Sequence, residues 1–238
     1  MPFLNSARPL LRLHHVKMFA LLAIFCVLTL GCVESKHPFS DPDASVADLS
    51  AVGVWKEVVE SNKVSLLIIG LNPYRSAKGA PPGLMSFQRV ELGEENELSS
   101  GSEGTFFPSK IGNDNFMNCY RKNTEDLRSL QSEGDKYVMV WKPNMDDYFT
   151  ILKYRLDGDQ LELWDGNEEG VAAAIESGGV KGIVERDAKD NHLTVAKLTD
   201  TTANIRKYIA TNGSKVLFRE NTKKRIVASN YHNEPVWN

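Results

Sequence analysis

Residues 147–165, DYFTILKYRLDGDQLELWD, decide the fold. Two runs of alternating apolar and polar residues flank Asp157-Gly158, a dipeptide favoured in the two-residue turns of antiparallel hairpins. A slip of one residue would move the Leu and Tyr side chains to the charged face, so the pattern predicts a hairpin with one buried face. The cross-strand pairs expected from this turn are Tyr154 with Leu161, Leu152 with Leu163 and, on the other face, Lys153 with Glu162.

The same alternation recurs along the chain in short runs broken by Gly, Pro, Asn and Asp, as is typical of antiparallel sheets. One run, Val64–Leu71, is apolar on both faces. We expect it to lie centrally, covered by the core on one side and by a helix or the opposite wall on the other. The predicted strands are 53–60, 63–71, 84–92, 104–111, 115–121, 136–142, 147–156, 159–165, 181–187, 192–198, 214–219 and 224–229.

Helices are predicted at two places, and a third is possible at 124–132. Residues 168–177 follow Asn167, which can cap a helix, and precede Gly178, which can end one. Residues 201–211 follow the same logic, with Asp200 or Thr201 as cap and Asn212-Gly213 as stop.

Many short strands, few helices and no alternation of strand and helix predict a mainly β fold with two or three short helices. We expect an antiparallel β-barrel or a strongly curved meander, lipocalin-like in outline. Residues 53–238 are long enough for a single β-rich domain with its own core.

The N-terminal segment has the composition of an export signal. Met18–Leu30 is a run of 13 uncharged residues, and Arg8, Arg12 and Lys17 precede it. A helix of this length reaches about 20 Å, short of the roughly 30 Å hydrocarbon core of a bilayer. The run therefore predicts a cleaved signal peptide over residues 1–31 rather than a permanent span.

The end of that segment, Leu28-Thr29-Leu30-Gly31-Cys32, resembles the lipobox of bacterial lipoproteins, although Thr29 stands where that pattern usually has Leu. The resemblance implies cleavage between Gly31 and Cys32 and a diacylglyceryl group on Cys32. An ordinary signal peptide followed by a coincidental cysteine is the alternative. No Asp follows Cys32, which by the same resemblance implies the outer membrane, facing the periplasm. Residues 32–52, rich in Pro, Ser and Asp, are predicted to form a flexible tether that spans about 25 Å.

Charge argues against nucleic acid as a partner. Residues 1–31 hold three of the 28 Lys and Arg and none of the 31 Asp and Glu, so the mature chain has a net charge of −6. Phosphate backbones demand a basic surface.

A second resemblance rests on the run Tyr154-x-Leu156-x-Gly158-Asp159-x-Leu161-x-Leu163-Trp164, on Ala174-Ile175-x-x-Gly178 with Lys181-Gly182, and on Leu198-Thr199-Asp200-Thr201 leading to Tyr208-Ile209 and Phe218. These residues look like those of an uncharacterised family of bacterial exported β-rich proteins, over about a third of the chain. The resemblance supports export and the order of hairpin and helices, and it implies no activity.

No constellation predicts catalysis, a cofactor or a metal. Asp165 to Glu176 matches the acidic positions of a calcium loop, but a strand precedes it and a helix interrupts it, so a turn and a capped helix explain it better. Cys119 lies in an alternating strand, which favours a small buried hydrophobe over a nucleophile. The Asp and Glu pairs fall in turns and helix starts, where they have local roles.

These observations favour a lipid-anchored cell-envelope protein with a non-enzymatic binding or structural role, whose partners are the membrane and an envelope protein. The alternative is a periplasmic carrier of a small apolar ligand or lipid. Aromatic residues on many strands, such as Trp55, Phe106 and Trp164, are expected in the core, but they could also line a barrel interior that admits one such ligand.

Overall fold

The computed structural model of the protein describes residues 32–58, 64–92, 98–122, 127–134, 136–143, 147–222 and 224–228. They all belong to one compact unit, Gly31–Asn238. The predicted signal peptide, residues 1–31, lies outside the described residues. Within the described ranges, no helix has the length and apolar character needed to cross a bilayer.

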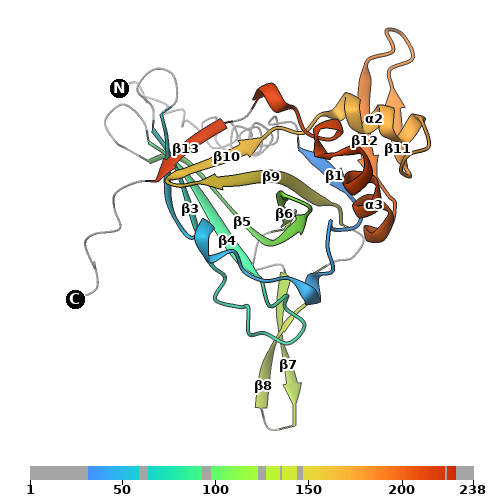
Figure 1. Ribbon diagram of the computed structural model, residues 1–238. Coiled ribbons are helices and arrows are strands. Elements are labelled where there is room, and N and C mark those ends of the chain that lie inside the picture. Colours follow the sequence, from blue (N-terminus) through green and yellow to red (C-terminus); the bar gives the residue numbers. More distant parts are fainter. Residues whose placement is uncertain are drawn as a thin grey trace, which may run out of the picture. The chain divides into compact units, whose positions relative to one another are not determined.

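Eight strands of the described chain close into an antiparallel barrel, which confirms the predicted fold class (Figure 1). Each strand pairs with the next in the chain, and the last pairs with both β10 and the first, β2. The barrel is therefore an up-and-down meander with insertions. In order around the barrel, the strands are β2 (Gly53–Val58), β3 (Val64–Leu71), β4 (Met85–Leu92), β5 (Leu98–Ile111), β6 (Asp114–Tyr120), β9 (Phe149–Asp157), β10 (Gln160–Trp164) and β13 (Lys224–Ala228).

Two insertions interrupt the meander. Between β6 and β9, strands β7 (Arg128–Glu133) and β8 (Lys136–Trp141) form a separate two-stranded hairpin. Between β10 and β13 come helix α2 (Glu168–Glu176), strands β11 (Gly182–Arg186) and β12 (Leu193–Leu198), helix α3 (Thr202–Asn212) and the short 3-10 helices η6 (Ser214–Val216) and η7 (Glu220–Thr222). Strands β11 and β12 extend the sheet beyond β9 through β1 (Val33–Ser35).

The decisive hairpin forms, but its register differs from the prediction by two residues. Leu161 pairs with Leu156, Leu163 with Tyr154, and Glu162 with Arg155. The two turn residues are Gly158 and Asp159 rather than Asp157 and Gly158, because Gly158 takes a φ of 61° at the first central position, where a type II′ turn favours glycine. A shift of two residues keeps every side chain on its predicted face.

Both main helices are confirmed together with their ends. The side chain of Asn167 accepts from the Gly170 amide at the start of α2, and Gly178 follows its end with a φ of 73°. The Thr201 side chain caps α3. Two other predictions are wrong: 128–132 belongs to β7 instead of a third helix, and 214–216 forms η6 instead of a strand. Residues 124–126 lie outside the described residues.

The predicted tether over 32–52 is also wrong, because these residues are built into the fold. Strand β1 pairs with β9 on one side and β12 on the other. Phe39 is fully buried, and its backbone amide donates to the Asn118 side chain over 2.7 Å. The 3-10 helices η2 (Pro42–Ala44) and η3 (Leu49–Ala51) then lead to β2, and Ala51 is buried in the barrel core. Local composition suggested flexibility, but pairing with distant strands overrides it.

The barrel wall separates two packed cores. The interior core includes Trp55, Met85, Phe106 and Tyr154, and the outer core lies between the wall and helices α2 and α3. Strand β3 lies between β2 and β4, as predicted, and buries Ile69 in the interior. The prediction that its other face is covered by a helix or the opposite wall is wrong at Ile68, which is 37% exposed.

Candidate functional site

Cys32, the predicted lipidation site, lies at a fork in the sheet. One edge of β9 pairs first with β1, where Val33 faces Ile151, and then with β10, where Trp164 faces Lys153. Cys32 and the start of the segment after β10 therefore meet beside Leu152. The pKa of the Cys32 thiol is raised to about 12, mainly by burial and to a smaller extent by the carboxylates of Asp165, Glu34 and Glu168.

Cys119, the other described cysteine, is a buried core residue. It lies on the interior face of β6, and its thiol is free, as is that of Cys32. Burial raises the pKa of the Cys119 thiol well above its usual range, which disfavours the nucleophilic thiolate. Strand β9 separates β1 from β6, so the two cysteines are two strands apart, about 10 Å, too far for a disulfide.

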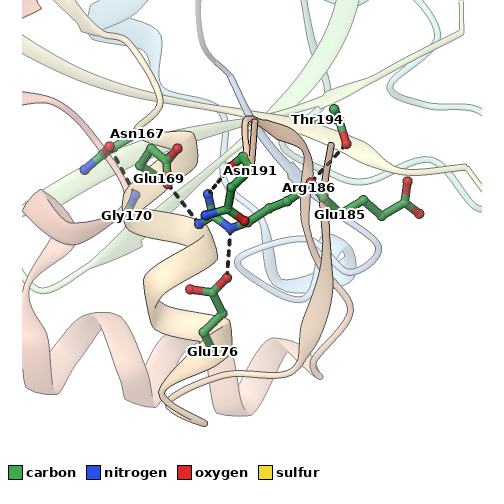
Figure 2. A network of polar contacts seen from close by, with 8 residues as sticks. All are labelled: Asn167, Glu169, Gly170, Glu176, Glu185, Arg186, Asn191 and Thr194. Carbon is green, nitrogen blue, oxygen red and sulfur yellow. Dashed lines mark hydrogen bonds and ion pairs between the residues drawn. The ribbon is translucent and has the colours of Figure 1, made fainter. Parts of the chain in front are cut away.

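Two of the acidic residues of the segment Asp165–Glu176 bind an arginine (Figure 2). Glu169 is the second residue of α2 and Glu176 is its last. Their carboxylates bind the guanidinium of Arg186 on β11 at 3.1 and 3.2 Å. The same guanidinium donates to the Asn191 carbonyl. This clamp ties α2 to β11. In the described part of the chain, no three His, Cys, Asp or Glu side chains gather closely enough to hold a metal ion.

Two buried charges on the outer barrel face also have structural partners. Glu162 is 2% exposed and binds Arg155 at 2.6 Å and Arg225 at 3.2 Å. Lys153 is buried under η6, where it binds Asp114 at 3.1 Å and Ser214 at 2.8 Å. Sequence alternation marked both residues as outward-facing, but it gave no sign that neighbouring elements would cover them.

The aromatic residues that could have lined a ligand cavity pack against one another instead. Trp55, Phe106 and Tyr154 belong to one interior cluster and are at most 5% exposed. The Tyr154 hydroxyl donates to Asp48 just before η3, and the Trp55 ring N–H donates to the Ala51 carbonyl. Trp164 instead joins the outer core. This packing favours a core role for these side chains over a ligand cage.

A groove of about 350 Å³ lies on the outer face of β3, β4 and β5. The strand register explains it, because two small residues, Gly70 and Ser86, pair on neighbouring strands and leave a shallow strip. Thr105, which pairs with Ser86 on the other side, is fully buried and does not line the groove. A Cβ added to Gly70 would meet nothing within 4 Å, which shows how open the strip is.

Polar and apolar groups border the groove on both sides. The next row pairs Ile68 with Gln88 and Gln88 with Glu103, which supplies an apolar surface, an amide and a carboxylate. Tyr74 lies on the other side, and the Arg128 guanidinium lies over its ring, 4.2 Å from the ring centroid. A concave surface with a few convergent polar groups suits binding. No local sequence motif predicts this site, because it depends on how separate strands are aligned.

Comparison of the chain with protein-family models, with curated proteins and with solved structures found no match.

Proposed function

We propose that the protein is an exported lipoprotein whose mature chain starts at Cys32 and is anchored by lipid on that residue, in the outer membrane facing the periplasm. One observation carries the proposal. The compact unit starts at Gly31 and its first strand at Val33, so the lipobox-like sequence ends where the fold begins. Cleavage after Gly31 would leave β1 and everything after it intact.

The role that the geometry supports best is non-enzymatic binding. The buried ionisable groups, such as Glu162 and Lys153, are held by structural partners. The groove on β3, β4 and β5 offers the amide of Gln88 and the carboxylate of Glu103 to an envelope partner. The alternative, transport of an apolar ligand inside the barrel, would require the interior cluster around Trp55 and Tyr154 to open.

Mass spectrometry of the N-terminal peptide tests the anchor. The native protein is expected to yield a peptide that starts at Cys32 and carries fatty acyl mass, and Cys32→Ser is expected to lose both features. Cys26→Ser is the matched control, because it removes the cysteine inside the apolar run and should leave the modification intact. A native product that retains Met1, or one without acyl chains, contradicts the proposal.

Photo-crosslinking in intact cells tests the binding role. A crosslinking amino acid at Gln88 is expected to give a defined adduct that Gly70→Leu abolishes, since the new side chain fills the open strip. A crosslinker at the exposed Glu185 of β11 is the control and should give no such adduct. Equal adducts at both positions, or adducts that survive Gly70→Leu, contradict a binding role for the groove.

A further inference from the structure

The residue proposed to carry the lipid joins the folded domain without a spacer. Val33, the next residue, is already paired with Ile151 of β9, and Glu34 pairs with Lys197 of β12 on the other side. The Lys36 amide continues the pairing by donating to the Leu198 carbonyl over 2.8 Å. One extended residue spans about 3.5 Å. Cys32 therefore cannot move far from the sheet.

The register also identifies the surface beside Cys32. The edge of β9 passes from β1 to β10 at Leu152, so Asp165, which follows β10, lies next to Cys32. The Asp165 and Glu168 carboxylates are near enough to act on the Cys32 thiol electrostatically. Glu168 is exposed at the first turn of α2. Cys32 and Asp165 beside it are half-buried, and we call these three residues the anchor surface.

The anchor surface is held rigidly. The Arg219 amide donates to the Asp165 carbonyl over 2.9 Å, and the Asn167 amide donates to the Leu217 carbonyl over 2.8 Å. Asn167 also donates from its side chain to the Val216 carbonyl while it caps α2. The segment from β10 into α2 is thus bonded to the segment that follows η6, and it cannot swing aside as a loop.

We infer that, once Cys32 carries its lipid, the bilayer lies directly against the anchor surface and holds the domain in one orientation, with the start of α2 toward the headgroups. This inference rests on the proposed function. A flexible tether of about 20 residues would instead let the domain turn freely at about 25 Å from the lipid. Cys32 adjoins a strand that is paired on both sides. Acyl chains on this residue therefore keep the domain close to the lipid and prevent it from turning freely.

Fluorescence quenching on vesicles tests the orientation. The lipidated full-length product is labelled at Glu168→Cys in one variant and at Tyr137→Cys in another, then placed in phosphatidylcholine vesicles with headgroup-attached quenchers. Tyr137 is 78% exposed on the β7–β8 hairpin, which projects from a different part of the unit (Figure 1). Cys119 is buried and is expected not to react with the dye under native conditions.

Quenching at Glu168→Cys is expected to exceed that at Tyr137→Cys by about threefold or more. A Gly/Ser insertion of about 20 residues between Cys32 and Val33 restores a tether and should remove the difference. Equal quenching at both positions in the original chain, or a difference that survives the insertion, overturns the inference while the lipid remains in place. Absence of lipid on Cys32 by mass spectrometry overturns the proposed function and this inference with it.

Discussion

Glu162 is a carboxylate buried on the outer barrel face beneath two arginines. Its partners Arg155 and Arg225 are more than half exposed, so they lie over the carboxylate rather than in the core. Replacing both arginines with Ala leaves a buried charge with fewer partners, and we expect a loss of about 3 kcal/mol in the free energy of unfolding. Glu162→Leu removes the charge itself and should cost about 1 kcal/mol or less. Urea unfolding measures both, and equal losses would contradict this account.

Stability is expected to fall at alkaline pH because buried groups keep their protons in the folded state. Burial raises the pKa of the Cys119 thiol. The pKa of the Tyr154 hydroxyl is also raised, mainly by burial and secondly by its hydrogen bond to Asp48. The unfolded chain releases these protons near pH 8.5 and pH 10, about the ordinary pKa values. The contribution of these two groups to the free energy of unfolding is therefore fully present below about pH 8.5, and it is lost as pH rises through their raised pKa values.

The two contributions can be separated by substitution in a Cys32→Ser background. Cys119→Ala should flatten the decrease that begins above about pH 8.5, and Tyr154→Phe should flatten the part that begins above about pH 10. Urea midpoints measured from pH 7 to pH 11 provide the test. Curves that stay parallel to the parent in both variants would show that neither group is responsible.

The segment before β2 is an integral element of the fold, and Phe39 tests this. Phe39 is fully buried, packs edge-on against Phe116 with ring centroids 5.3 Å apart, and accepts at its carbonyl from Arg206. Phe39→Ala is expected to cost about 3–5 kcal/mol in the free energy of unfolding. Val46→Ala, in the same segment but 79% exposed, is the control and should change it by less than about 0.5 kcal/mol. If the segment were a flexible tether, neither substitution would change the free energy of unfolding.

The β9–β10 hairpin and helices α2 and α3 could be predicted from local signals, whereas strand β1 and the groove could not. The β9–β10 hairpin and the caps of α2 and α3 depend on residues a few positions apart, so alternation, Asn167 and Gly178 sufficed. Strand β1 has only three residues and pairs with β12, far along the chain. No local periodicity can reveal such a strand. The groove depends likewise on the register that aligns Gly70 with Ser86.

At the scale of the whole molecule, strand β9 belongs to both cores. Its Tyr154 packs in the barrel interior and its Ile151 packs in the outer core beneath the helices. Neither core can lose its packing without removing a wall of the other. We therefore expect the barrel and the outer layer to unfold together in one cooperative transition. The β7–β8 hairpin is held differently, at its base, by the small cluster of Leu84, Leu127 and Trp141.

Three tryptophans report on these three regions separately. Trp55 lies in the interior core, Trp164 in the outer core and Trp141 at the base of the hairpin. Variants that keep one of them, with Trp237 and the other two replaced by Phe, are expected to give coincident urea midpoints for Trp55 and Trp164. The Trp141 midpoint should come at lower urea, because a two-stranded hairpin on a small cluster opens more easily. Separate midpoints for Trp55 and Trp164 would mean that β9 does not couple the two cores.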